Sequence, residues 1–248
     1  MNTLIWAHRG ASGYAPENTM EAFKLANEQR ADGIELDIHL TKDSHLVVSH
    51  DEAIDRCSNG KGRIIDKTLE ELLTYDFSNH LPKYKNSKIP TLKEVLRFVR
   101  DTKMTINIEI KSDIVIYEGI EEKVTALVSK LGMKKRVMYS SFNHHSLMLI
   151  KKLDRTIPIG LLYNEAMVDP HVYAAHLKAD AIHPYYLTLM VPDTISGCKL
   201  LGININTWTV NEPEHMAWMF KEGVNAIITN YPDVALKQEI KYINKQSS

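Results

Sequence analysis

The stretch that sets the fold class is Gly33-Ile34-Glu35-Leu36-Asp37-Ile38-His39. Successive side chains of a β-strand point to opposite faces, so the three aliphatic residues share one face and the two acids share the other. The aliphatic face is suited to a covering layer of helices, and this leaves Glu35 and Asp37 pointing inward. Because a buried carboxylate is costly unless it is paired, the run indicates a buried strand that carries a functional site.

Similar β-rich runs alternate with amphipathic helical patterns along nearly the whole chain. The runs cover residues 4–8, 33–39, 105–111, 136–142, 157–163, 179–184, 204–210 and 225–229. Alternation of strands and helices predicts a parallel sheet. Eight such units favour closure into a TIM (β/α)₈ barrel over an open sheet, because closure removes both sheet edges. The predicted fold class is therefore α/β.

Three helical patterns follow residues that commonly cap helix N-termini. The caps and their helices are Asn18 before residues 19–30, Thr91 before 92–100 and Asn211 before 212–222. An acid also lies close to the start of each pattern, as in a capping box, where side chains satisfy the free amide groups of the first turn.

One stretch interrupts the alternation after the second strand. Residues 42–45 resemble a tight hairpin turn, and a two-residue loop at Asp43-Ser44 would place Asp37 across from His50. Residues 51–88 then lack the barrel periodicity and contain one short helix pattern over 68–75. We interpret them as a small insertion over one face of the barrel, within a single domain that covers residues 1–248.

The composition excludes several classes of protein. Of the 248 residues, 44% are hydrophobic and 25% are charged, which is normal for a globular chain. A formal net charge of −1 predicts no nucleic-acid partner, and no apolar run approaches the length of a membrane span. Two cysteines are too few for a disulfide framework, and the first residues do not resemble a signal peptide. We therefore expect a cytoplasmic protein without stable membrane insertion, and the oligomeric state is left open.

Three acids are expected to meet at one end of the barrel. Active sites of such barrels form at the carboxyl ends of the strands, where Glu35, Asp37 and Glu109 lie on two consecutive strands. Carboxylates that converge would repel one another, and a divalent cation removes the repulsion. Oxygen ligands favour Mg²⁺, Ca²⁺ or Mn²⁺ over zinc. The three acids are the predicted metal ligands.

Two histidines and two cations lie around these acids. His8 ends the first strand, and the hairpin would return His50 to the same place, so that two imidazoles could act as general acid and base near neutral pH. Arg9 follows the first predicted strand, and Lys111 ends the third. Cations beside a divalent metal suit an anionic substrate, and a phosphate diester fits best.

Six motifs in order resemble the glycerophosphodiester phosphodiesterase family. The similarity extends from the first strand to Thr229, nearly the full chain. The motifs are His8-Arg9-Gly10 through Glu17-Asn18-Thr19, then Glu35-Leu36-Asp37 with Thr41-Lys42-Asp43 and His50-Asp51, then Asn59-Gly60-Lys61-Gly62, Pro90-Thr91-Leu92-Lys93-Glu94, Glu109-Ile110-Lys111 and Trp208-Thr209-Val210-Asn211.

The resemblance implies a TIM barrel with an insertion after the second strand and one bound divalent metal ion. It implies hydrolysis of small glycerophosphodiesters to sn-glycerol 3-phosphate and an alcohol. The implied metal ligands are Glu35, Asp37 and Glu109, the acid–base pair is His8 and His50, and Arg9 and Lys111 hold the phosphate. Ser44 departs from the family, which often has glycine in this turn.

Some alternatives stay open. A lyase or phospholipase related to sphingomyelinase D or to phosphatidylinositol phospholipases would share the barrel and much of the site. A non-catalytic barrel that binds phosphodiesters would lack a catalytic histidine or a metal acid, and neither is missing here. Trp208 is either a core aromatic or a wall of the substrate site. Helix capping is enough to explain Asn18, and His39 is assigned a structural role.

Overall fold

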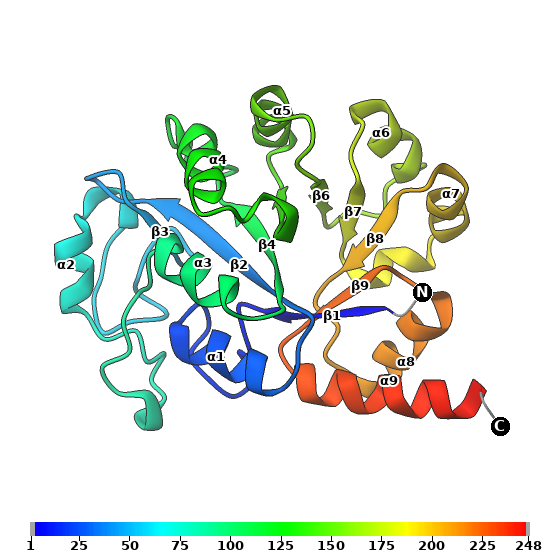
Figure 1. Ribbon diagram of the computed structural model, residues 1–248, viewed down its shortest axis with the longest axis horizontal. Helices are drawn as coiled ribbons and strands as arrows, with labels where there is room; N and C mark the ends of the chain where they lie inside the picture. Colours follow the sequence, from blue (N-terminus) through cyan, green and yellow to red (C-terminus); the bar gives the residue numbers. More distant parts are fainter. Residues whose placement is uncertain (1–2, 247–248) are drawn as a thin grey trace.

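The computed structural model describes residues 3–246, in which eight parallel strands form a closed barrel surrounded by helices (Figure 1). Pairing of β1 with both β9 and β2 closes the sheet, and the short strand β3 adds to β2 in the antiparallel sense. The strands are β1 Leu4–His8, β2 Gly33–Leu40, β3 Leu46–Val48, β4 Thr105–Ile110, β5 Val137–Ser141, β6 Ile159–Tyr163, β7 Ala181–Pro184, β8 Asn204–Thr207 and β9 Ala226–Thr229. Each of the eight predicted runs coincides with one barrel strand to within a few residues at its ends, so the predicted barrel is confirmed.

The helices follow the strands in chain order. The α-helices are α1 Met20–Glu28, α2 Leu69–Thr74, α3 Leu92–Arg100, α4 Ile120–Lys130, α5 His144–Leu153, α6 Pro170–Leu177, α7 Thr194–Leu201, α8 Pro213–Glu222 and α9 Pro232–Gln246. The 3₁₀ turns are η1 Ile64–Asp66, η2 Pro82–Tyr84, η3 Lys134–Arg136 and η4 Tyr186–Met190. Among the described residues, no helix has the length and apolar character needed to span a membrane.

The main core lies between the outer face of the barrel and the helices. The aliphatic face of β2, formed by Ile34, Leu36 and Ile38, is fully buried in this cluster. Residues of α3, including Leu92 and Val99, belong to the same cluster. The alternation in the β2 sequence therefore points its two acids into the barrel, as predicted.

The hairpin after β2 has a different register from the predicted one. Ile38 pairs with Val48, and the amide of Ser49 donates to the carbonyl of Asp37 at 3.1 Å, so Ser49 and not His50 lies opposite Asp37. The predicted two-residue loop was wrong because the turn contains three residues. Ser44 closes it with a left-handed φ of 64°, the conformation that a three-residue hairpin loop requires at its last position.

The helix caps agree in part with the prediction. Thr91 accepts from the amide of Glu94, whose side chain accepts in return, so the capping box of α3 is confirmed. The N-cap of α1 is Thr19, and the prediction of Asn18 was wrong. The predicted cap at Asn211 was also wrong, because α8 begins after Glu212 and has no side-chain cap bond. Both asparagines are used elsewhere, near the carboxyl ends of the strands.

Residues 51–88 pack beside β3 and carry α2, which lies at the left end of the molecule in Figure 1. A small separate apolar cluster supports this segment; its buried members are Val47, Ile54, Cys57, Ile64, Leu72, Phe77 and Ile89. The helix pattern predicted over residues 68–75 is present as α2, and Thr68 and Glu71 form its capping box. The segment begins directly after His50 and so borders the carboxyl end of the barrel.

Candidate active site

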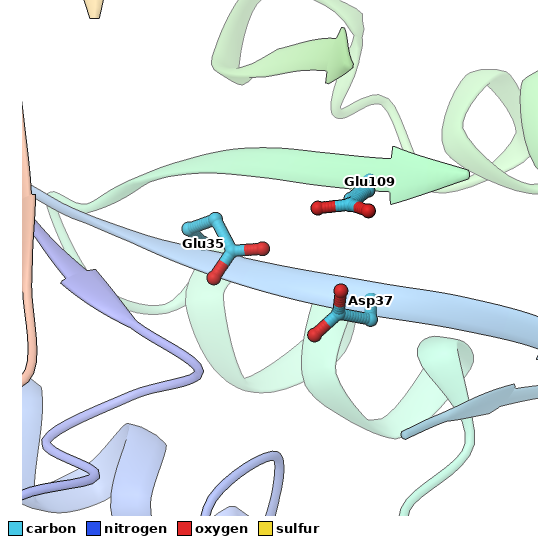
Figure 2. A group of neighbouring side chains, drawn as sticks. All are labelled: Glu35, Asp37 and Glu109. Carbon is cyan, nitrogen blue, oxygen red and sulfur yellow. The ribbon is translucent and has the colours of Figure 1, made fainter. Parts of the chain in front are cut away.

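Three carboxylates converge inside the barrel. Glu35 and Asp37 come from β2, and Glu109 comes from β4, where it is the register partner of Asp37. One carboxylate oxygen of each lies within 4.8 Å of the others, and Figure 2 shows the three groups turned toward one another. All three residues are buried, with 4%, 1% and 8% of their surface exposed. The period-2 pattern of two adjacent strands produces this arrangement.

The electrostatics of these acids favour a bound cation. Burial, followed by the charges of Asp37 and Glu109, raises the pKa of Glu35 well above its ordinary value. Burial and the charge of Asp37 raise the pKa of Glu109 to about 7. Burial alone would raise the pKa of Asp37, but the charges of Arg9, His50 and Lys111 and the hydrogen bond from Asn18 together outweigh burial and lower this pKa.

One oxygen of this acid group also lacks a partner. Oδ1 of Asp37 is buried and has no hydrogen-bond partner among the described residues. A divalent ion would satisfy this oxygen and reduce the repulsion between the carboxylates. The residues therefore fit a metal site for a cation that prefers oxygen ligands.

Arg9 and Lys111 bind directly to the acids. The backbone amide of Arg9 donates to Oε2 of Glu35 at 3.0 Å, and its Nε lies 3.5 Å from Oδ2 of Asp37. Nζ of Lys111 donates to Oε1 of Glu109 at 3.0 Å. Burial alone would lower the pKa of each cation, but the neighbouring carboxylates raise both. Two permanent positive charges thus lie beside the acids.

The two histidines approach the pocket from different loops. Nδ1 of His8 donates to Oδ1 of Asn230 at 2.7 Å, and its Nε2 lies 4.0 Å from Oε2 of Glu35. Burial and the charge of Arg9 lower the pKa of His8 to about 4. In His50, Nδ1 donates to Asp51 at 2.7 Å. Each imidazole therefore has its Nδ1 proton fixed and its Nε2 available.

His50 reaches the site even though its predicted strand register was wrong. His39, which is fully buried, donates from Nε2 to the carbonyl of His50 at 3.1 Å. Its Nδ1 accepts from the hydroxyl of Tyr117 at 2.8 Å. Nε2 of His50 then lies 3.5 Å from Nζ of Lys111. The backbone at His50 is thus held by a buried histidine, one residue beyond the hydrogen bond from Ser49 to Asp37.

Most of these side chains line a cavity of about 40 Å³ that opens to solvent. Its walls are formed by His8, Arg9, Glu35, His50, Asn107, Glu109, Phe142, Leu162, Trp208 and Ile228. One side is polar and the other is apolar. The ring of Trp208 meets Phe142 edge-on at 5.7 Å between ring centroids, and its Nε1 donates to the carbonyl of His183 at 2.8 Å. Trp208 is thus both anchored to the barrel and part of the cavity wall.

Sequence reasoning missed several residues that support the site. Asn18 is buried and has a left-handed backbone conformation, with φ 57°. Its side-chain amide donates to Oδ2 of Asp37 at 2.8 Å. Asn230 holds His8 and directly follows β9. The position of Asn230 directly after a predicted strand was the sequence signal that could have identified it. Asn107 faces the cavity from β4 and shares the face of Glu109, two residues further along.

Comparison with known proteins agrees with this geometry. The model of the glycerophosphoryl diester phosphodiesterase family matches residues 8–234. The chain belongs to this family. A glycerophosphodiester phosphodiesterase of Caldanaerobacter subterraneus subsp. tengcongensis is 46% identical over 237 residues, which are 95% of this chain and 97% of the relative. Family membership and this identity make the chain an enzyme of the phosphodiesterase class.

Solved structures of the family share the fold over nearly the full length. A phosphodiesterase from Oleispira antarctica, in complex with the product sn-glycerol-3-phosphate, has a TM-score of 0.85 and 28% identity and covers 96% of each chain. A glycerophosphodiester phosphodiesterase from Agrobacterium tumefaciens has a TM-score of 0.83 and 28% identity, over 95% of this chain and 99% of that one. These solved relatives therefore share the overall fold of this chain.

Proposed function

We propose that the protein hydrolyses small glycerophosphodiesters to sn-glycerol 3-phosphate and an alcohol, with one divalent metal ion. The observation that carries the proposal is the group of three buried carboxylates flanked by Arg9 and Lys111. The Oleispira relative, in complex with sn-glycerol-3-phosphate, supports the choice of product. Mg²⁺ or Ca²⁺ suits the oxygen ligands, and Mn²⁺ is compatible with them.

Glu35, Asp37 and Glu109 are the proposed metal ligands. The bound ion would act as a Lewis acid, which neutralises charge on the phosphate and makes a nearby hydroxyl easier to deprotonate. Asn18 supports the ligand set from behind, because its amide fixes the orientation of the Asp37 carboxylate. Such support of ligands is a general requirement of metal sites.

Arg9 and Lys111 are the proposed phosphate-binding residues. Both are cations held at the acid group by ion pairs, so their charges are in position before the substrate arrives. Donors that are already oriented stabilise the charge that develops on phosphate oxygens in the transition state. The apolar wall with Trp208 would pack against carbon atoms of the substrate.

His8 and His50 are the proposed acid–base pair. Burial keeps His8 unprotonated at neutral pH, so it suits removal of a proton from the glycerol hydroxyl next to the esterified carbon. That oxygen attacks phosphorus, and the bond to the leaving alcohol breaks as His50, whose ring is held by Asp51, gives the alcohol a proton. Water then opens the cyclic glycerol phosphate, with the two histidines exchanging roles. The intramolecular attack gains from proximity.

A panel of glycerophosphodiesters with different headgroups would test the proposal. The chelated and the metal-reloaded protein should be compared for release of glycerol 3-phosphate. We expect release only with metal, and absence of the product from every substrate would overturn the proposed function. Accumulation of a cyclic phosphate without glycerol 3-phosphate would instead identify a lyase.

A further inference from the structure

The guanidinium of Arg56 lies between two carboxylates. Its Nε and Nη2 donate to Oδ2 and Oδ1 of Asp51, at 2.7 and 3.0 Å. Its Nη1 and Nη2 donate to Oε2 and Oε1 of Glu17, at 2.7 and 2.8 Å. Both contacts are bidentate, which is the geometry in which a planar guanidinium binds carboxylates most strongly.

Each of these carboxylates also binds a residue of the candidate active site. Oδ1 of Asp51 accepts from Nδ1 of His50 at 2.7 Å. Oε1 of Glu17 accepts from Nη1 of Arg9 at 2.9 Å. A side chain from the 51–88 segment therefore connects the histidine that precedes this segment with the arginine that follows β1.

We infer that Arg56 is a positioning residue, which fixes the ring of His50 through Asp51 and the guanidinium of Arg9 through Glu17. The inference rests on the roles proposed above for His50 and Arg9. All three guanidinium nitrogens of Arg56 donate to Asp51 or Glu17, so it acts through these two neighbours and not on the substrate.

The contacts of Asp51 and Arg56 fix the orientation of the His50 ring. The side chain of His50 is 30% exposed, and a ring in such a place could rotate or change tautomer without a fixed partner. Asp51 holds the proton on Nδ1 and so leaves Nε2 facing Lys111. Arg56 fixes Asp51 in turn, because two parallel hydrogen bonds restrict a carboxylate more than one does.

Stability alone does not explain this contact. The Arg56 side chain is 45% exposed, and exposed ion pairs usually contribute little to the free energy of unfolding. Removal of the side chain should therefore leave the fold intact. Misplacement of two active-site groups, by contrast, lowers the rate strongly even when the change lies outside the pocket.

The test compares Arg56→Ala and Arg56→Lys with the control Arg63→Ala. Arg63 lies in the same segment, is 53% exposed and has only a loose pair to Asp66 at 4.0 Å. Both Arg56 variants should lose about tenfold to a hundredfold in kcat/KM, because lysine keeps the charge but not the planar fork. The control should stay near the wild-type value. Full activity of Arg56→Lys would overturn the claim that the planar geometry matters.

Two further readouts separate positioning from a merely structural role. Low millimolar guanidinium should partly restore Arg56→Ala and leave Arg63→Ala unchanged. Nitrogen-15 NMR of the His50 ring should show one tautomer in the wild type and a mixture in Arg56→Ala, at unchanged metal affinity. An unaltered ring spectrum together with wild-type kcat/KM would refute the inference.

A failure of the proposed function would look different. His50→Ala would then retain the activity of the wild type, whatever the activity of the Arg56 variants. If His50→Ala is inactive while Arg56→Ala is fully active, the proposed function stands and the positioning role is wrong.

Discussion

Nζ of Lys111 lies 3.0 Å from Oε1 of Glu109, two residues earlier on the same face of the chain. The pair is buried, with side-chain exposures of 7% and 11%. A buried cation next to a carboxylate lowers the carboxylate pKa, and Lys111 has this effect on Glu109, although burial still keeps that pKa raised. The same ammonium group is the proposed phosphate donor. Lys111 thus connects the acid group with substrate binding.

Replacement of Lys111 by alanine tests this double role. We expect Lys111→Ala to lose about 10²–10³-fold in kcat/KM, which is typical when one oriented electrostatic donor is removed. Steady-state kinetics at saturating metal would measure the loss. Lys134→Ala is a matched control, because Lys134 pairs with Asp154 at 2.9 Å on an exposed surface. A near wild-type value for Lys111→Ala would leave Arg9 as the main phosphate donor.

The acid group predicts how stability depends on pH. In the folded, metal-free protein the pKa of Glu109 is raised from its ordinary value of 4.5 to about 7. Between these two pH values the folded state therefore binds more protons than the unfolded state. The stability contribution of this group is therefore fully present below pH 4.5 and is lost as the pH rises through about 7. Divalent metal should then raise the Tm more at pH 8 than at pH 5.5, since protons compete with the ion at low pH.

Thermal melts with and without metal at both pH values would measure this effect. Glu109→Gln removes both the titrating group and a proposed metal ligand, so it should lose most of the metal-induced Tm increase at both pH values. A metal-induced Tm increase that is equal at both pH values in the wild type would contradict the prediction.

Much of the fold and of the site could be predicted because simple periodicities determine them. Alternation along β2 placed Glu35 and Asp37 inside the barrel, and the same rule on β4 added Glu109. The hairpin register could not be predicted, because it depends on whether Ser44 adopts a left-handed φ. Such local backbone conformations change the pairing register of the two strands, while the positions of the strands in the sequence stay the same.

The support of the site was harder to predict than the site itself. Asn18 looks like a helix cap in the sequence, and only the left-handed backbone at this position turns its amide toward Asp37. Arg56 lies in a segment without periodicity, and its partners Glu17 and Asp51 are brought together by tertiary structure alone. Polar contacts between distant segments carry no spacing signal that a sequence pattern could detect.

We predict that the segment after His50 determines the selectivity for the headgroup. Exchange of residues 58–88 for those of a relative keeps Asp51 and Arg56 in place but changes the rest of the segment that follows the cavity residue His50. We expect altered preference among glycerophosphodiester headgroups and an unchanged requirement for metal. Competition assays with mixed substrates would measure the preference, and chelator titration would serve as the control. An unchanged preference would assign selectivity to the loops of the barrel.

The reaction route makes a prediction about the substrate hydroxyl. If the hydroxyl next to the esterified carbon attacks phosphorus, a substrate without it should be nearly inert, because the proximity of an internal nucleophile is lost. A single-turnover reaction followed by phosphorus NMR should also show a cyclic glycerol phosphate before glycerol 3-phosphate. His50→Ala should slow formation of the cyclic species for a poor leaving alcohol more than for a good one, since only the poor one needs a proton on departure. Rapid hydrolysis of the deoxy substrate would instead require direct attack by water on the diester.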